Sequence, residues 1–222
     1  PEMTIWATPP PHLVVDHPDC IGSTGSQNFM VRVTVEETGE PLRSAKVVIT
    51  HEEAEILAMA YTDHAGRARL ELEWPPEGFV DLTVSHMLYR PYLGWIQTTP
   101  EGADFTSLQP DSAIQGEVVQ VEALGFSWDE EVKLNLGDTI LESVEAVNGA
   151  VVAPAGFTVP VPFELDWNNL LAQGKTSGRC AAEVLRVRSD TTVDLYTYNA
   201  RDRSTWHLHR GGNPTWNSPN VS

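Results

Sequence analysis

The sequence predicts an all-β protein built from tandem antiparallel β-sandwich domains. Two observations support this fold class. Short runs in which apolar and polar residues alternate with period two recur along the chain, as in strands with one buried face. Clusters of Gly, Pro, Asn and Asp separate these runs, and the resulting spacing, about seven short strands in residues 1–98, is that of a sandwich.

A predicted β-hairpin organises the first half of the chain. Residues 63–66 (Asp-His-Ala-Gly) form a tight-turn sequence, because Asp can bond its own backbone and Gly accepts a positive φ. Apolar residues alternate with other residues up to Ala60 before this turn and from Ala68 to Leu72 after it. We therefore expect two paired strands with one buried face.

The other strands expected in the first half flank this hairpin. Residues 1–18 are expected to be extended, and their run of three prolines suits an edge strand. Further strands are predicted at residues 29–35, 45–50, 79–85 and 93–96. The polar segment 99–104 contains Pro and Gly and is the predicted linker, so the first domain is expected to span residues 1–98.

A second β-sandwich is predicted over residues 105–222. Strands are expected at residues 114–126 and 131–136, and the Asn148-Gly149 pair predicts a hairpin turn. Residues 167–173 are expected to form a short helix, with Asp166 as N-cap and Gly174 beyond its end, or else a loop that displays Trp167. Strands resume at residues 181–188, 191–198 and 205–209, and they complete the second sandwich or begin a truncated third module at about residue 180.

Length and charge limit the classes of function. The chain has 222 residues and a formal net charge of −17, which repels phosphate backbones and argues against nucleic acid as a partner. No stretch approaches the ~18 apolar residues of a membrane-spanning helix. Because the chain opens without Met or a leader sequence, we expect either a processed protein or a fragment of a longer one, and its abrupt end favours the fragment. Its two cysteines, Cys20 and Cys180, either form a disulfide or remain unpaired thiols.

Several segments of the first half follow the order found in one known family. They are residues 1–6, 31–35, 39–42 with 45–47, 62–68 and 82–89. In this order they resemble the immunoglobulin-like domain that follows the catalytic domain in gingipain-type cysteine peptidases. The resemblance covers residues 1–98, while residues 105–160 are similar to bacterial surface immunoglobulin-like repeats.

This resemblance implies a non-catalytic, extracellular or cell-surface segment of a secreted bacterial multidomain protein. In that family the domain accompanies the peptidase, whose catalytic His and Cys lie in the preceding domain, and no segment of this chain matches their motifs. The partners implied are other domains of the same polypeptide. We accordingly expect no catalytic residue and no cofactor in this chain.

Aromatic residues of the second half are candidates for a carbohydrate-binding surface, because aromatic rings pack against the CH groups of sugars. The alternative function is therefore adhesion, with glycans or surface proteins as partners. The same residues could instead pack in sandwich cores or between domains, since Trp is usually largely buried. The candidates are Trp128, Trp167, Trp206, Trp216, Tyr196 and Tyr198.

Three further patterns concern nucleophiles and metals. His207 and His209 lie two apart on one predicted strand, but no third metal ligand can be assigned. His51 lacks the second His of a zinc-protease helix, and neither cysteine has a His base in a local motif. Acidic residues near predicted turns could hold structural calcium or could simply be hydrated. These acids are Asp16, Asp19, Glu36, Glu37, Asp63, Asp104, Asp111, Asp129, Glu130 and Glu131.

Overall fold

The structure, a computed structural model, describes residues 9–52, 55–100, 102–141, 143–152, 156–189, 195–199, 204–208 and 215–217. These residues form strands and no helix, which confirms the predicted all-β class. The chain divides into two compact units, Pro1–Val187 and Arg188–Ser222. The first unit contains two hydrophobic cores, and we call the parts around them the first module (residues 9–100) and the second module (residues 102–187).

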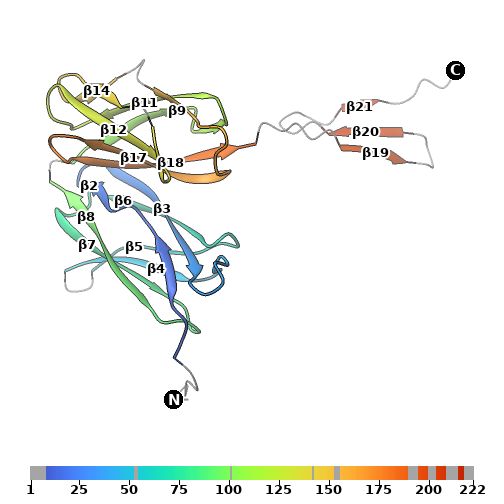
Figure 1. Cartoon of the computed structure of the whole chain (residues 1–222), viewed down its shortest axis with the longest axis horizontal. Helices are drawn as coiled ribbons and strands as arrows, with labels where there is room; N and C mark the ends of the chain where they lie inside the picture. The colour runs from blue at the N-terminus through green and yellow to red at the C-terminus, as the bar shows by residue number, and fades with distance from the viewer. Residues whose placement is uncertain are drawn as a thin grey trace. The chain divides into compact units, whose positions relative to one another are not determined.

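Two facing sheets form the first module (Figure 1). One sheet has the order β1 (Leu13–Asp16), β3 (Ser26–Val35), β6 (Arg67–Glu73). The other has the order β2 (Cys20–Gly22), β8 (Tyr92–Thr99), β7 (Gly78–Ser85), β4 (Lys46–His51), β5 (Glu55–Tyr61). Apolar side chains of both sheets meet in one core that includes Phe29, Ile49, Leu72, Leu82 and Ile96.

The predicted hairpin of the first module is wrong, although its turn is present. The Asp63 carboxylate accepts hydrogen bonds from the backbone N–H groups of Ala65 (2.8 Å) and Arg67 (3.0 Å), and Gly66 has a φ of +73°. The strands on either side, however, pair in opposite sheets, β5 with β4 and β6 with β3. Alternation fixes which face of a strand is buried but not which strand lies beside it. A second departure from the expected antiparallel pairing is that β2 pairs with β8 in parallel.

The second module also consists of two facing sheets. The first has the order β10 (Ser112–Ile114), β18 (Cys180–Arg188), β17 (Asp166–Gly174), β12 (Glu130–Leu136), β13 (Thr139–Ile140), and β14 (Val144–Ala146) also pairs with β12. The second has the order β15 (Ala150–Val151), β11 (Val118–Leu124), β16 (Gly156–Thr158), and β9 (Asp104–Gln109) also pairs with β11. Their shared core includes Val121, Leu134, Leu136, Phe157 and Leu170.

Residues 167–173 belong to strand β17, so the predicted short helix is wrong. Strand β17 pairs with β12 on one side and with β18 on the other. Leu170 and Ala172 point into the second core, while Leu171 packs against the core of the first module. Because apolar residues occur on both faces, the period-two pattern of a strand is hidden in the sequence.

The predicted turn at Asn148-Gly149 is present. Both residues have positive φ values, +54° for Asn148 and +79° for Gly149. The residues on either side, Val147 and Ala150, exchange backbone hydrogen bonds of 2.8 and 3.1 Å. This is the backbone geometry that an Asn-Gly pair favours at a two-residue turn.

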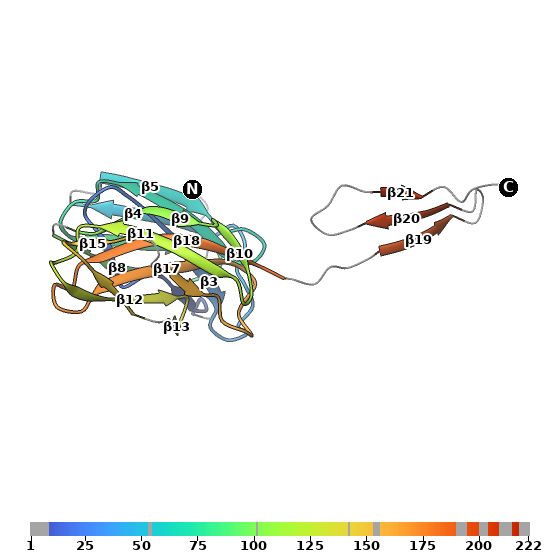
Figure 2. The same ribbon diagram turned by 90° about the horizontal axis from the view of Figure 1, so that it is seen from above.

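The sheet that contains β3 lies against the sheet that contains β17 and β18, so the two modules share an interface (Figures 1 and 2). Strand β3 directs Phe29 and Val31 into the first core and buries Met30 on its opposite face. Strand β18 likewise contributes Ala181 to the second core and Ala182 to the first. The middle strands are therefore buried on both faces.

The second compact unit contains a three-stranded antiparallel sheet in the order β19 (Leu195–Asn199), β20 (Ser204–Leu208), β21 (Thr215–Asn217). Strands β19 and β20 overlap the strands predicted at residues 191–198 and 205–209, whereas β21 was not predicted. In the register of this sheet, Tyr196 stands opposite His207 and Trp206 stands opposite Trp216.

Candidate functional site

The interface between the two modules is the candidate functional site, and a disulfide crosses it. Cys20 lies on β2 of the first module, Cys180 begins β18 of the second, and the two are bonded across a sequence separation of 160. From the sequence alone, a disulfide and two unpaired thiols were equally consistent. Since both sulfur atoms are in the disulfide, neither is available as a nucleophile.

Gln27 forms a fully buried junction beside the disulfide. Its side-chain oxygen accepts hydrogen bonds from the backbone N–H groups of Gly22 and Ala182, each 3.0 Å long. Its side-chain nitrogen donates to the backbone oxygens of Thr24 (2.7 Å) and Ala103 (3.2 Å). One side chain thus satisfies backbone groups of both modules, and a buried amide gains all the partners it can use.

The segment that connects the modules is packed against the first module. Gly102 and Ala103 are buried, and the backbone oxygen of Gly102 accepts a hydrogen bond from the Thr24 hydroxyl. A Cβ atom at Gly102 would lie 2.3 Å from the backbone nitrogen of Ser23, so only glycine fits there. Close backbone approach of this kind limits the orientations that the connection allows.

Asn169 on β17 pairs with the backbone of Met30 on β3. Its side-chain oxygen accepts a hydrogen bond from the Met30 N–H (2.6 Å), and its side-chain nitrogen donates to the Met30 oxygen (2.9 Å). Strand β6 pairs with β3 at Met30, but β1, on the other edge of β3, pairs only with residues 32–35, so the amide takes the place of a backbone neighbour on that edge. Both backbone groups would otherwise lose their partners on an inner face.

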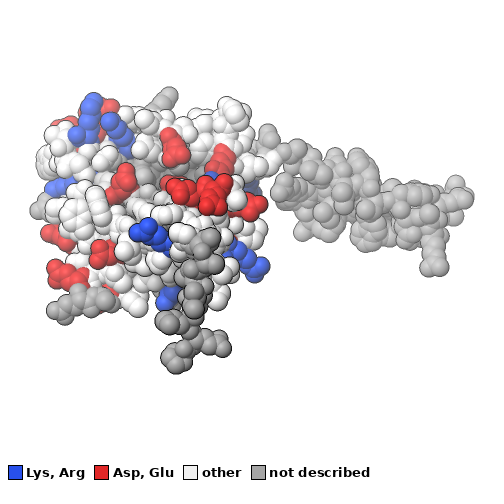
Figure 3. Space-filling view, turned by 60° about the horizontal axis from the view of Figure 1, so that its bottom comes forward, with Lys and Arg blue, Asp and Glu red and all other residues white. Residues whose placement is uncertain are grey.

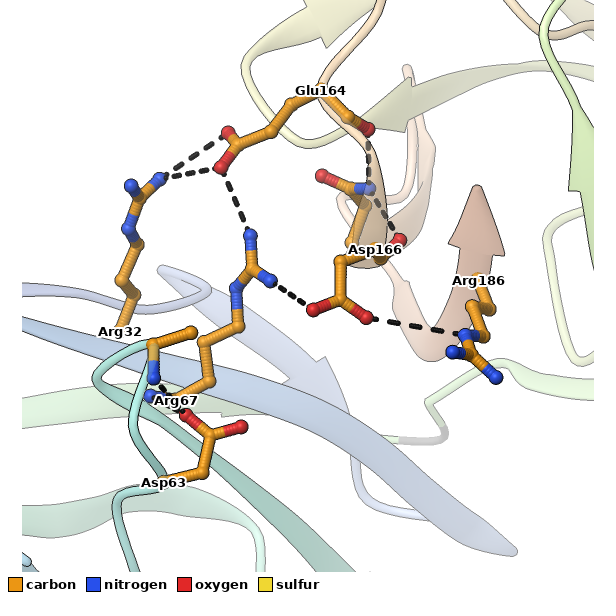
Figure 4. Close-up of polar contacts among 8 residues, drawn as sticks. Arg32, Asp63, Arg67, Glu164, Asp166 and Arg186 are labelled. Atoms are coloured by element: carbon orange, nitrogen blue, oxygen red, sulfur yellow. Dashed lines mark hydrogen bonds and ion pairs between the residues drawn. The ribbon is translucent and has the colours of Figure 1, made fainter. Parts of the chain in front are cut away.

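An ion-pair network extends this interface along its edge (Figure 4). Arg67 of the first module, whose side chain is 9% exposed, contacts Glu164 (2.9 Å) and Asp166 (2.6 Å) of the second. Arg32 contacts the same Glu164 carboxylate at 3.0 Å, and Arg186 lies 4.0 Å from Asp166. The network joins charges of both modules, so its geometry depends on their relative position.

Trp167 lies at this interface, where it is partly buried. The guanidinium groups of Arg69 and Arg186 lie over its ring, at 5.3 and 5.8 Å from the centroid. Arg69 belongs to the first module and Arg186 to the second, so the ring packs between them. Trp167 therefore packs between the modules, which was the alternative to sugar binding that the sequence left open for this residue.

A groove of about 660 Å³ opens between the modules beside this network, and we call it the intermodule cleft. Strands β1 and β3 and the residues that follow β1 form one wall, with Asp16, Asp19, Met30 and Arg32. The opposite wall comes from β12, the turn after it and the segment before β17, with Asn135, Asp138, Phe163 and Glu164. Polar groups of two modules thus face one solvent-accessible space.

Carboxylates of the cleft influence one another. Asp16 lies at the rim, and the protein atoms packed around its carboxyl raise its pKa above the ordinary value. Asp138 and Glu164 raise this pKa further, whereas His17 and Arg32 oppose them. On the face drawn in Figure 3, acidic side chains gather with Lys and Arg around them, as expected from the net charge of −17.

Two polar atoms of the cleft residues are buried and have no hydrogen-bond partner among the described residues. They are the side-chain oxygen of Asn135 and the Nε of Arg32. Asn28 and Asp104 each have one such oxygen as well, but neither residue lines the cleft. Because buried polar atoms are nearly always paired, these atoms indicate where further hydrogen bonds can form.

The other predicted binding residues lie elsewhere. Trp128 is 75% exposed on the second module. Tyr196, Tyr198, Trp206, His207 and Trp216 stand on the strands of the second compact unit, where the structure describes only the backbone. His209 lies outside the described residues. Their binding roles remain predictions.

One of the acids considered for calcium is instead a hydrogen-bond acceptor for a loop. Glu130 is buried and accepts hydrogen bonds from the backbone of Thr176 (3.1 Å) and from the backbone and hydroxyl of Ser177 (2.9 and 2.7 Å). Burial raises the pKa of Glu130, but these hydrogen bonds and one from Ser127 outweigh it, so the pKa is lowered. Nowhere in the described ranges do three His, Cys, Asp or Glu side chains gather as metal ligands would.

Sequence reasoning did not identify Gln27, Asn169 or Arg67 as interface residues. Their partners lie far along the chain, 139 positions away in the case of Asn169 and Met30. A signal was present in β3, where the polar Gln27, Asn28 and Arg32 flank the apolar run from Phe29 to Val31. The described residues also include no helix long and apolar enough to cross a membrane.

No family model and no curated protein match this chain. Similar solved structures include the BSP domain of a biofilm-associated protein, at 12% identity and a TM-score of 0.38, covering 81% of this chain and 30% of that one. Escherichia coli alpha-2-macroglobulin matches at 14% identity and a TM-score of 0.33, covering 92% of this chain and 14% of that one.

A Bacteroides ovatus protein, SGBP-B of a mixed-linkage glucan utilization locus, solved with a mixed-linkage heptasaccharide, matches at 12% identity and a TM-score of 0.32, over 85% of this chain and 48% of that one. The chain thus spans less than half the length of each of these three proteins. Likeness this distant carries no argument about function, and it adds no support to the resemblance to gingipain-type peptidases.

Proposed function

We propose that this chain is a non-catalytic, extracellular segment of a secreted multidomain protein, in which it holds two β-sandwich modules in one fixed orientation. The observation that carries the proposal is the interface between the modules. A disulfide, the buried Gln27 junction and the Asn169 pairing with Met30 all join the first module to the second.

A change in the relative orientation of the two modules would break the hydrogen bonds and ion pairs between them. Moving one module would leave the backbone groups bound by Gln27 and Asn169 without partners, at about 1–3 kcal/mol for each buried group. It would also separate Arg67 from two carboxylates. Domains that move relative to each other usually share a small and relatively polar interface. The interface between these two modules instead contains fully buried hydrogen bonds and a covalent bond.

The disulfide also supports the extracellular part of the proposal, because such bonds persist in oxidising compartments and are rare in the cytosol. Both cysteines are used in this bond, which agrees with a segment that does not itself supply a cysteine nucleophile. The resemblance of residues 1–98 to the gingipain-type accessory domain adds a specific parent to the proposal. That parent is a cysteine peptidase whose catalytic domain lies outside this chain.

The intact mass of the native protein from its source, with and without reduction, tests this proposal. A mass well above the 24.5 kDa of this chain, unchanged by reduction except for the added hydrogens, supports a segment of one longer polypeptide. Peptide sequencing upstream of Pro1 then identifies the parent's catalytic class. A native mass close to 24.5 kDa would contradict the proposal and favour a free-standing adhesion protein.

A further inference from the structure

We propose that the intermodule cleft binds a neutral, hydroxyl-rich ligand, that is, a saccharide chain. This proposal goes beyond the fixed orientation of the modules. It places a binding site between them, built from side chains of both.

The two unpartnered polar atoms of the cleft define the chemistry required. Asn135 of the second module and Arg32 of the first line the cleft, and the unpartnered acceptor oxygen of the one and the unpartnered N–H donor of the other are buried in its walls. When these side chains turn toward the cleft, hydroxyl groups of a ligand can donate to the oxygen and accept from the N–H, because a hydroxyl carries one hydrogen and two lone pairs. A bare cation can bind only to the acceptor oxygen, and a fully ionised phosphate group can accept only from the N–H donor.

The charges of the cleft lead to the same conclusion. Asp16, Asp19 and Asp138 line it and form no ion pair with any described residue, so an anionic ligand would be repelled. A cation would meet the guanidinium groups of Arg32 and Arg67, and it would lack a set of three close ligands in the described part of the chain. A neutral ligand avoids both penalties, and carboxylates readily accept hydrogen bonds from its hydroxyl groups.

The size and the walls of the cleft fit such a ligand. Its volume of about 660 Å³ lies within the range of about 300–1,000 Å³ that small-molecule sites occupy. Phe163, which is partly exposed, offers apolar surface to the CH groups of a sugar ring, next to the polar atoms. Trp167 also lines the cleft, but its ring is engaged by Arg69 and Arg186 and here forms part of the wall.

Isothermal titration calorimetry on the full, oxidised chain tests the proposal. The probes are cellohexaose, maltohexaose, xylohexaose, mannohexaose, calcium chloride and sodium phosphate, each at pH 7 and 150 mM NaCl. We expect at least one of the hexasaccharides to bind with a Kd of millimolar or tighter, and neither salt to bind. Failure of all four hexasaccharides, or saturable binding of calcium or phosphate that competes with them, would overturn the proposal.

Two substitutions in the cleft and one matched control locate the binding. Asn135→Ala removes the unpartnered acceptor, and Arg32→Lys removes the Nε donor while keeping a cation for Glu164. Each is expected to weaken hexasaccharide binding at least tenfold. Asn28→Ala removes an equally buried and unpartnered amide oxygen outside the cleft, and it should leave the Kd within twofold.

Circular dichroism melting curves verify that each variant is folded. If Asn135→Ala fails to fold, Arg32→Lys alone decides the question. Unchanged affinity in the folded cleft variants, or an equal loss in Asn28→Ala, would place the ligand elsewhere and contradict the proposal.

Discussion

The side-chain amide of Asn169 pairs with the backbone of Met30 in both directions, accepting from its N–H at 2.6 Å and donating to its oxygen at 2.9 Å. Asn169 belongs to the second module and Met30 to the first. The backbone of one β-sheet is therefore completed by a side chain of another. This contact therefore depends on the relative position of the two modules.

Replacing Asn169 with Leu keeps the side-chain volume but removes both hydrogen bonds to Met30. Two backbone groups then lose their partners in an inner layer, and we expect the free energy of unfolding to fall by about 2 kcal/mol or more. Urea denaturation followed by circular dichroism measures this loss. Gln173→Leu, at an exposed position of the same strand, should change stability by less than about 0.5 kcal/mol. Equal effects of the two substitutions would count against the assigned role of Asn169.

Gln27→Leu should have a larger effect, because four backbone groups, three of them in buried hydrogen bonds, depend on that amide. Even with partial rearrangement we expect a loss of about 3 kcal/mol or more. Hydrogen exchange at the Gly22 and Ala182 amides should accelerate in the variant, since these are the groups released. The exposed Gln97 on β8 gives the matched control, Gln97→Leu. Unchanged exchange at both amides would contradict the junction.

Arg67 and Lys175 allow a comparison of a buried and an exposed ion pair. The Arg67 side chain is 9% exposed and contacts two carboxylates, whereas Lys175 is 56% exposed and contacts Glu131. Arg67→Met should lower the free energy of unfolding by about 1–3 kcal/mol, and Lys175→Met by less than about 1 kcal/mol. Thermal melts of both variants in low and high salt test this order. A reversed order would show that the network contributes little.

Removing the disulfide should destabilise the protein mainly through its unfolded state. The bond closes a loop across a sequence separation of 160, for which loop-closure entropy predicts up to about 5 kcal/mol at 25 °C. We expect the Cys20→Ser and Cys180→Ser double variant to lose about 2–5 kcal/mol while keeping the strand content of the wild type. Urea titrations of the double variant and of the reduced wild type should agree. A loss below about 0.5 kcal/mol would indicate that the bond adds nothing to the packed interface.

The raised pKa of Asp16 makes stability depend on pH. Packing around the carboxyl, followed by Asp138 and Glu164, disfavours its charged form in the folded state. Above the raised pKa the charged group therefore destabilises the fold, and this penalty is relieved as the pH falls through that pKa toward the ordinary value near 3.8. Asp16→Asn should raise the melting temperature at pH 7 and leave it unchanged at pH 3. A lower melting temperature at pH 7 would contradict this assignment.

The alternation that identifies a strand was visible where one face is polar, but it was hidden in β17, one of the strands at the interface. In β6 the exposed Arg69 and Glu71 alternate with the buried Leu70 and Leu72, and the predicted strand was correct. Strand β17 has Leu170 facing one core and Leu171 facing the other, so it lacks this alternation and was predicted as a short helix or a loop. The other interface strands, β3 and β18, overlap the strands predicted at residues 29–35 and 181–188.

Strand pairings and side-chain contacts were harder to predict than the strands themselves. The turn at residues 63–66 was correct, yet the strands beside it joined opposite sheets, because pairing depends on contacts far along the chain. The same holds for the cleft, whose walls come from residues more than 100 positions apart in sequence, such as Arg32 and Asn135. Trp167 was singled out for its aromatic ring, whereas its contacts with Arg69 and Arg186 followed only from the fold.

Residual dipolar couplings of backbone amides in the full, oxidised chain test the central claim of a fixed orientation most directly. We predict that one alignment tensor fits the strand amides of both modules, and that the fit worsens in the Gln27→Leu variant. Two tensors of different magnitude for residues 9–100 and 102–187 of the wild type would mean that the modules move independently. That result would contradict the proposed function.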